Sequence, residues 1–269
     1  VFPRALVPIA LQYLSMRYFH VIWPTWLAMV VYAAYLIAFS CMMLFHMNDL
    51  AQKHGFLDGQ SRRDQIPDLK ITSTMLGLLA TVTVRPIFGC FVAYSPAVLP
   101  RISPWLPVHL FMYTMVLDFW FYIYHRAMHE VNFLWRFHKT HHMTKHPNPM
   151  LSAFGDPEQD FFDILVIPML TYMAYPLDFH TWWICNVYTL YVEAAGHTGI
   201  RIVWPATTTY YPLKYFGMDH IIEDHDLHHR NGWRKSFNYG KQTRVWDTLF
   251  GTTRPGQIRV ECIPENIAS

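Results

Sequence analysis

Charged residues are scarce in this chain, in which Asp, Glu, Lys and Arg make up 15% of 269 residues. Apolar residues account for 52% and aromatic residues for 17%, a balance too apolar for an ordinary soluble domain. The formal net charge is only +2, and no basic stripe is interleaved with aromatic residues, so the composition argues against a nucleic-acid-binding protein. The scarcity of charge favours a membrane protein.

Cysteine and several cofactor motifs are also rare or missing. The four cysteines, Cys41, Cys90, Cys185 and Cys262, are scattered without paired spacing, which argues against a disulfide framework or a cysteine-based zinc ribbon. No G-x-G-x-x-G turn, flavin fingerprint or haem-binding HPGG sequence is present, so an enzyme that uses electrons would take them from an external donor. H-E-x-x-H is absent too, which argues against a zinc protease.

Three long apolar runs are each predicted to cross a bilayer as a helix, since a crossing takes about 20 apolar residues. They occupy residues 23–45, 71–94 and 105–124, and the first contains no charged residue. Two shorter runs, 161–175 and 180–196, are predicted to form a fourth and a fifth crossing, or a shallow hairpin that dips into the bilayer. The predicted fold class is therefore all-α and integral to the membrane, with about four transmembrane helices.

Histidines gather in three short motifs, which we call box one, box two and box three. Their sequences are HRAMH at 125–129, HKTHH at 138–142 and HDLHH at 225–229. Residues three and four apart share a helical face, so each box is predicted to aim its imidazoles one way, and the distant third box to converge with the first two on one metal site. The eight candidate ligands are His125, His129, His138, His141, His142, His225, His228 and His229.

The number of histidines indicates how many metal ions the boxes serve. Eight imidazoles are twice what one tetrahedral zinc requires, which indicates two ions. Imidazole suits Zn, Fe, Cu and Ni alike, so the ligand type alone leaves the metal open. Two readings follow from the residues: an oxygen-activating redox pair, or a membrane zinc hydrolase or metal-handling protein.

A resemblance to a known family rests on three features of the sequence. They are the order of the three boxes, the closing segment NYGKQTRVWDTLFGT at 238–252 and the apolar spans between the boxes. Over residues of about 70–255 the chain resembles the fatty acid hydroxylase and sterol desaturase superfamily of integral-membrane di-iron oxygenases. The resemblance implies a membrane scaffold of four helices under a cytosolic helical cap that holds a histidine-ligated dimetal centre. It also implies two Fe ions, for which Zn can substitute in overproduced protein, with O2 and two electrons as co-substrates.

The activity that the resemblance implies is hydroxylation of an unactivated C–H bond in a hydrophobic substrate. Fatty acyl, sterol, sphingoid and terpenoid or polyketide lipids all fit, and desaturation or epoxidation by the same family is the alternative. Electrons are expected from a cytochrome b5 or a reductase that docks on the basic cap. The expected location is the endoplasmic reticulum, with the metal site facing the cytosol.

The resemblance and the apolar runs together predict one membrane-embedded catalytic domain, residues 1–269. Its expected parts are an interfacial lead-in (1–22), transmembrane helices (23–123), boxes one and two (124–160), a membrane hairpin (161–196) and a cytosolic cap with box three (197–269). Placing the boxes and the loop 47–70 in the cytosol, with the turns near Arg101 and Asp178 opposite, puts nearly all Lys and Arg outside the spans on the cytosolic side.

Three further histidines are considered as ligands beyond the boxes. His197, in EAAGHTG, matches a position where many members of the superfamily have His followed by Ser or Thr and Gly, so it is nominated as a ninth ligand. The alternative for His197 is a hydrogen bond to Glu193, one turn earlier on the same helix. His146 and His220 are weaker candidates for a tenth ligand, because Pro147 disfavours helix at His146 and His220 lies off the helical face of His225.

Carboxylates near the boxes are candidates for orienting ligand histidines. They are Asp118, Asp156, Glu193, Asp224, Asp226 and Asp247. Asp118 shares a helical face with His125, yet it could instead pair with Arg85 in the second apolar run. Asp156 stands in FGDPEQ, where many sterol-oxidising relatives read tyrosine, a small residue, His and Pro, so sterol C4-methyl oxidation is not transferred to this chain.

Overall fold

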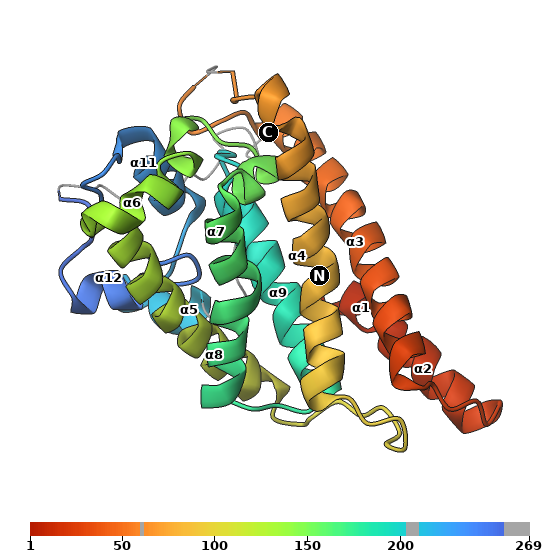
Figure 1. Ribbon diagram of the computed structural model, residues 1–269. Helices are drawn as coiled ribbons and strands as arrows, with labels where there is room; N and C mark the ends of the chain where they lie inside the picture. The colour runs from red at the N-terminus through yellow and green to blue at the C-terminus, as the bar shows by residue number, and fades with distance from the viewer. Residues whose placement is uncertain (60–61, 203–209, 256–269) are drawn as a thin grey trace, which may run out of the picture.

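The computed structural model describes residues 1–59, 62–202 and 210–255 (Figure 1). Within these ranges the chain forms helices, turns and loops without a β-strand, apart from isolated bridges such as Phe56 with Ile200. The all-α prediction is confirmed for this part of the chain. Cys41, Cys90 and Cys185 are free thiols, and Cys262 lies outside the described residues.

Three helices in the described part of the chain are long and apolar enough to cross a membrane. They are α3 (Thr25–His54), α4 (Ile71–Ala93, preceded by the 3-10 turn η1, Asp68–Lys70) and α5 (Leu106–Glu130). All three overlap the predicted spans, although α3 continues to His54, into the segment 47–70 predicted as a loop. Length and composition identify three candidate crossings, and the total of about four and the hairpin at 161–196 stay predictions.

The hairpin region consists of two helical arms joined by a short turn (Figure 1). The first arm is a continuous stretch of α7 (Pro157–Phe161), the π-helical turn η4 (Phe162–Val166) and α8 (Ile167–Ala174). The second arm is α9 (Phe179–Gly196), which begins where the Asp178 carboxylate accepts hydrogen bonds from the Thr181 N–H at 3.2 Å and hydroxyl at 2.6 Å. These bonds satisfy polar groups at the start of α9, as an N-terminal cap does.

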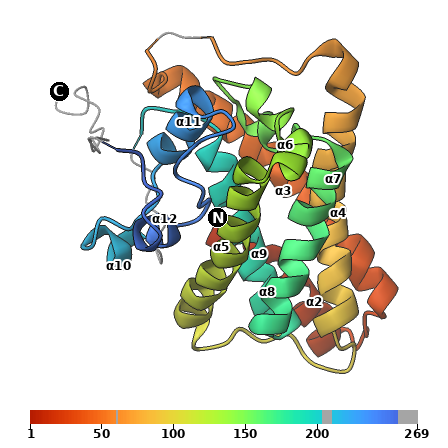
Figure 2. The ribbon, with the colours of Figure 1, turned by 60° about the vertical axis from the view of Figure 1, so that its left-hand side comes forward.

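Helix α9 forms the centre of the molecule, with the other long helices around it (Figure 2). Nearly all of its residues are buried, and Trp182 and Trp183 are fully so. Trp182 packs so closely on α4 that a Cβ at Gly89 would lie 2.1 Å from its ring. Glycine is needed there because any side chain would push the two helices apart.

The N-terminal segment packs onto this core through α1 (Phe2–Ala5) and α2 (Val7–Tyr18). Gln12 is fully buried, where its amide oxygen accepts a hydrogen bond from the Tyr32 hydroxyl at 2.9 Å. The Trp183 indole N–H donates to the Ala5 carbonyl at 2.8 Å. Residues 1–22 are therefore part of the packed domain as well as a lead-in to α3.

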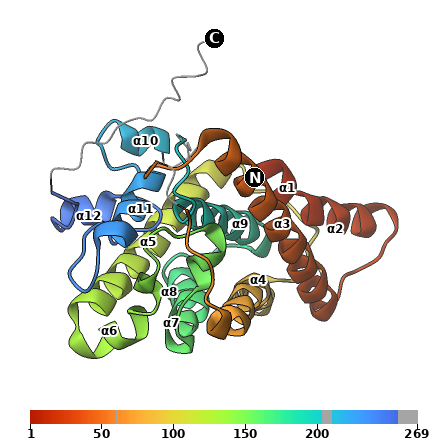
Figure 3. The same ribbon diagram turned by 90° about the horizontal axis from the view of Figure 1, so that it is seen from above.

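The histidine boxes lie at one end of the helices, together with the loop that joins α3 to α4 (Figure 1). The short elements beyond the long helices are α6 (Asn132–His138), η2 (His141–Met143), η3 (Pro149–Ala153), α10 (Tyr210–Lys214), α11 (Ile222–Asn231) and α12 (Val245–Leu249). From above, α10, α11 and α12 gather on the side of α5 away from α3 (Figure 3). The connections 94–105 and 175–178 lie at the opposite end, as the predicted topology requires.

Candidate metal centre

Box one lies in the last two turns of α5, and box two begins at the last residue of the short helix α6. His125 and His129 are one turn apart on the buried face of α5, while His138 is the last residue of α6. His141 and His142 sit in the 3-10 turn η2, after a break in the helix. The prediction that HKTHH aims its imidazoles one way from a single helix is therefore wrong.

All nine nominated histidines are at most 2% exposed, and they form two groups. Cluster one is His125, His129, His138, His142 and His228; cluster two is His141, His197, His225 and His229. Within each cluster the ring nitrogens that can bind an ion lie within 4.8 Å of one another. Boxes two and three each contribute histidines to both clusters, so the two clusters are adjacent.

Most of these rings are held by carbonyl oxygens through their Nδ1 atoms. In cluster one the acceptors are the carbonyls of Tyr239 for His125 (2.7 Å), Trp233 for His129 (2.8 Å) and Phe237 for His228 (2.6 Å), and the Gln159 amide oxygen for His138 (2.8 Å). In cluster two they are the carbonyls of Phe154 for His141 (3.0 Å), Glu193 for His197 (2.8 Å) and Thr144 for His229 (3.1 Å). A carbonyl only accepts, so each of these Nδ1 atoms carries the proton and each Nε2 is a bare lone pair.

His125 and His138 show what this arrangement requires. Both rings donate through Nδ1, yet their Nε2 atoms face each other at 3.0 Å. The orientation of the Gln159 amide is supported by its Nε2 atom, which lies 3.5 Å from an Asp163 carboxylate oxygen. Two lone pairs at hydrogen-bond distance in a buried site repel each other unless a cation lies within reach of both.

Among the described residues, four other ring nitrogens of the two clusters are buried without a hydrogen-bond partner. They are Nε2 of His129 and His229, and Nδ1 of His142 and His225. Burial together with the neighbouring imidazoles holds the pKa of His138, His142 and His228 well below the usual range. Burial likewise lowers the pKa of His197 to about 4. The rings are therefore neutral at physiological pH, which is the form that binds metal.

The two donor sets would each hold one metal ion. Each cluster contributes only imidazole nitrogen, five in cluster one and four in cluster two, and includes no thiolate. The five imidazoles of cluster one exceed the four protein ligands that close a structural zinc site, whereas the four of cluster two equal that number.

The remaining nominated histidines behave differently from one another. His197 is both hydrogen-bonded to the Glu193 main chain and turned with Nε2 toward Nε2 of His225 at 3.0 Å, so it joins cluster two. His146 lies apart from both clusters and pairs with Asp58. The His220 ring centroid is 6.5 Å from that of His225, outside the group of potential ligand atoms.

Asp118 and Asp247 hold the closing segment rather than a histidine ring. Asp118 accepts hydrogen bonds from the N–H groups of Lys241, Gln242 and Thr243 at 2.9–3.0 Å and from the Thr243 hydroxyl at 2.6 Å. Asp247 accepts from the N–H groups of Tyr239 and Gly240 at 2.8 Å. Since the Tyr239 carbonyl binds His125, these carboxylates fix a ligand ring through the main chain. Asp118 does not pair with Arg85.

The other four carboxylates also bind groups other than the rings. Asp156 accepts from the Thr140 hydroxyl at 2.8 Å and lies 3.3 Å from Lys70. Asp226 forms ion pairs with Arg63 and Arg230. Asp224 accepts a hydrogen bond from the Ile221 N–H and lies 3.6 Å from Arg244. The Glu193 carboxylate forms ion pairs with Lys241 and Arg85. The orienting role predicted for carboxylates is thus taken mainly by carbonyl oxygens.

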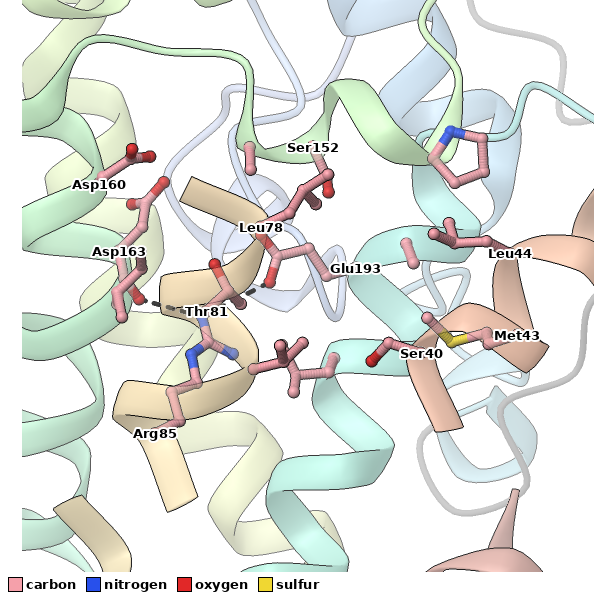
Figure 4. A pocket seen from close by; sticks show the side chains of 16 residues that line it. Ser40, Met43, Leu44, Leu78, Thr81, Arg85, Ser152, Asp160, Asp163 and Glu193 are labelled. Carbon is pink, nitrogen blue, oxygen red and sulfur yellow. Dashed lines mark hydrogen bonds and ion pairs between the residues drawn. The ribbon is translucent and has the colours of Figure 1, made fainter. Parts of the chain in front are cut away.

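A cavity of about 70 Å³ lies between α3, α4, η3, η4 and α9 (Figure 4). Apolar side chains such as Met43, Leu44 and Val82 form one part of its wall. On another part the Arg85 guanidinium donates to the Asp163 carbonyl at 3.0 Å and lies 3.7 Å from the Glu193 carboxylate. Glu193 is also the residue whose carbonyl holds His197, so one residue connects the cavity wall to cluster two.

Sequence reasoning missed three features of this site. Gln159, whose amide holds His138, stands in no motif that distinguishes it from other polar residues. Trp135 is inserted between the boxes and its ring packs 5.2 Å from that of His129, but an aromatic residue there reads as ordinary packing. The main-chain acceptors carry no side-chain signature at all.

Sequence comparison relates this chain to a known protein family. Residues 110–252 match the profile of the fatty acid hydroxylase family. The chain is 40% identical to fatty acid hydroxylase vlmA of a Lecanicillium species, over 98% of this chain and 78% of that protein.

Two further relatives are more distant. Cholesterol 25-hydroxylase of Homo sapiens is 28% identical, over 65% of this chain and 63% of that protein. Methylsterol monooxygenase 2-2 of Arabidopsis thaliana is 29% identical, over 67% of this chain and 65% of that protein. No solved structure gives a significant match.

Proposed function

Because the chain belongs to the fatty acid hydroxylase family, we propose that it is an O2-dependent membrane di-iron oxygenase that hydroxylates an unactivated C–H bond of a lipid-like substrate. The relatives are named as hydroxylases and monooxygenases of fatty acids and sterols, which supports a lipid-modifying oxygenase. The proposed balance is RH + O2 + 2 electrons + 2 protons giving ROH + H2O.

The observation that carries the proposal is the opposition of His125 and His138 within a cluster of five buried, neutral imidazoles, next to a second cluster of four. Such a site is unfavourable without bound cations and has room for two. Bound there, a pair of redox-active ions supplies the reduction of O2 and the removal of hydrogen from carbon. The all-imidazole donor set also suits zinc, which would contribute no redox chemistry.

The protein's own part is to hold the rings, exclude water and position the substrate. Carbonyl acceptors fix the ring orientations, and burial keeps the imidazoles neutral. The cavity between α3, α4 and α9 is the proposed seat of the substrate, with apolar walls for a hydrocarbon and Arg85 and Glu193 for a polar substituent. Fatty acyl, sterol, sphingoid and terpenoid or polyketide lipids remain within this description.

The proposed location is the endoplasmic reticulum membrane, with the clusters facing the cytosol. Three apolar helices support membrane association, and the clusters share one end with the Lys- and Arg-containing loop before α4. This orientation satisfies the positive-inside rule. A cytosolic cytochrome b5 or reductase would then reach the metal site without crossing the membrane.

The test uses purified protein loaded with ferrous iron, an electron donor, O2 and a panel of lipids. The proposal predicts substrate-dependent O2 consumption and a product with one added oxygen, both abolished by His141→Ala and by His228→Ala. A product that has lost two hydrogens instead would assign the chain as a desaturase of the same family. Full activity in either variant, or hydrolysis by a zinc-loaded preparation, would contradict the proposal.

A further inference from the structure

Trp233, directly after α11, exposes a large aromatic ring at the end of the molecule that holds the clusters. The residue is 48% exposed. Its ring packs edge-on against Trp135 of α6, with 5.0 Å between the ring centroids and 80° between the planes. A singly exposed aromatic residue is common on protein surfaces, so the significance of Trp233 lies in its contacts with Trp135 and with the metal clusters.

Trp135 carries the contact inward to cluster one. Its ring centroid lies 5.2 Å from that of His129 and 5.8 Å from that of His142. A second route is even more direct, because the Trp233 carbonyl accepts the Nδ1–H bond of His129 at 2.8 Å. Trp233 is thus joined to the His129 ring both through the ring of Trp135 and through a main-chain hydrogen bond.

The surface around Trp233 is basic. The Lys145 ammonium lies 5.1 Å from the centre of the Trp233 ring and donates to the Gly232 carbonyl at 2.6 Å. Arg234 and Lys235 follow Trp233 in the chain and are exposed, as are Arg136 and Lys139 on either side of His138. A nearby acidic group, Glu130, is engaged by Arg126 at 2.9 Å. The set of Lys145, Trp233, Arg234 and Lys235 is called the Trp233 patch below.

We infer that the Trp233 patch docks an acidic one-electron carrier protein and that the Trp233–Trp135 pair conducts its electrons to cluster one. Electron transfer between proteins falls steeply with distance, and contacting aromatic rings shorten the gap between the surface and the ligands. Opposite charges around a small apolar contact also steer a transient partner to one orientation. This inference rests on the proposed function, since only a redox-active metal pair would use the electrons.

The electron balance is simple. Each docking event oxidises the carrier by one electron and reduces the metal pair by one, so two events deliver the two electrons that one hydroxylation consumes. The protons come from water. Trp233 and Trp135 are neither oxidised nor reduced in net terms; their rings only couple donor and acceptor.

The experiment uses the full chain in lipid nanodiscs, loaded with ferrous iron, and a soluble acidic haem protein as the one-electron carrier. Binding of the carrier is measured by biolayer interferometry, and the reoxidation of its haem by stopped flow. Arg234→Glu with Lys235→Glu should raise the Kd at low salt by about tenfold or more, an effect that disappears at high salt. Lys53→Glu with Arg62→Glu is the matched control, because it makes the same charge change at two exposed positions, one at the end of α3 and one in the loop before α4.

The two tryptophans separate docking from conduction. Trp135→Leu should leave the Kd for the carrier unchanged and slow haem reoxidation by about tenfold or more, while Trp135→Phe restores most of the rate because it keeps a ring. Trp233→Leu should affect both quantities. Metal content is measured for each variant, so that a loss of iron is not mistaken for a loss of conduction.

A small-molecule reductant separates this inference from the proposed function. Product formed by the tryptophan variants at the rate of the unaltered chain with the small reductant, but about tenfold or more slowly with the carrier, supports the inference. Equal losses with both reductants, or carrier rates like those of the unaltered chain, overturn it. Loss of membrane association on Trp233→Leu without a change in carrier kinetics would assign the ring to the lipid interface instead. Absence of product with either reductant in the unaltered chain would reject the proposed function itself.

Discussion

The imidazole rings of His142 and His229 stack with 4.8 Å between their centroids and 18° between their planes, although they belong to different clusters. One ring comes from the turn after α6 and the other from α11, residues far apart in the chain. This ring contact joins the two clusters directly, so that two ions bound in them would lie close to each other.

The division of box three between the clusters predicts separate losses of metal. His228→Ala removes a ligand from cluster one and His229→Ala removes one from cluster two, so each variant should bind one iron tightly where the unaltered chain binds two. Inductively coupled plasma mass spectrometry on detergent-purified protein measures the count. His46→Ala, an exposed histidine on α3, is the control and should keep both ions. Retention of two ions in both box variants would reject the assignment of the clusters.

Substitutions at Gln159 should change metal affinity, although this side chain contacts a ligand ring rather than a metal ion. Gln159→Leu removes the acceptor of the His138 Nδ1–H bond and should weaken iron binding by about 10- to 100-fold. Gln159→Glu keeps an acceptor oxygen and should retain most of the affinity. Competition with a metal-sensitive dye measures both, and equal affinities for the Leu and Glu variants would show that the amide has no orienting role.

Asp118 predicts a large loss of stability. Asp118→Ala leaves three buried N–H groups and a hydroxyl of the closing segment without their acceptor, at a cost of about 1–3 kcal/mol for each unsatisfied group before relaxation. The melting temperature from detergent-phase fluorescence should fall sharply. Asp49→Ala, at an exposed position of α3, controls for loss of a carboxylate and should leave the melting temperature nearly unchanged.

Gly89 predicts a steric limit between α4 and α9. In Gly89→Ala the new methyl group would overlap the Trp182 ring, so the helices must separate, at a cost of about 1–3 kcal/mol. Val92→Ala, on the same helix at a partly exposed position, serves as the control. An unchanged melting temperature for Gly89→Ala would mean that the two helices are not packed as closely as the structure has them.

Much of the site could be predicted from the spacing of the histidines, because histidines three and four residues apart are rarely clustered without binding a common metal. His125 and His129 lie on one face of α5 as their spacing predicts. His138 and His141 do not, because α6 ends at His138 and the chain turns before His141. Side-chain identity gives no sign of that break, and the division into two clusters depends on it.

The groups that hold the rings were beyond the reach of sequence reasoning. Any residue has a carbonyl, so nothing in the sequence marks Tyr239 or Phe237 as the acceptor for a distant histidine. The carboxylates were visible, and two of them do act on the site, but through the main chain of the closing segment. The three long spans followed from the length of their apolar runs, whereas the shorter arms of 161–196 fall near the limit where length is decisive.

The central claim is that the paired clusters insert oxygen from O2 into a lipid C–H bond. Mass spectrometry of the product formed under isotopically heavy O2, in water of ordinary composition, tests it most directly. The account predicts one heavy oxygen atom in the product of iron-loaded protein and none in that of His138→Ala. A product oxygen that comes from water, or heavy oxygen incorporated equally by His138→Ala, would contradict it.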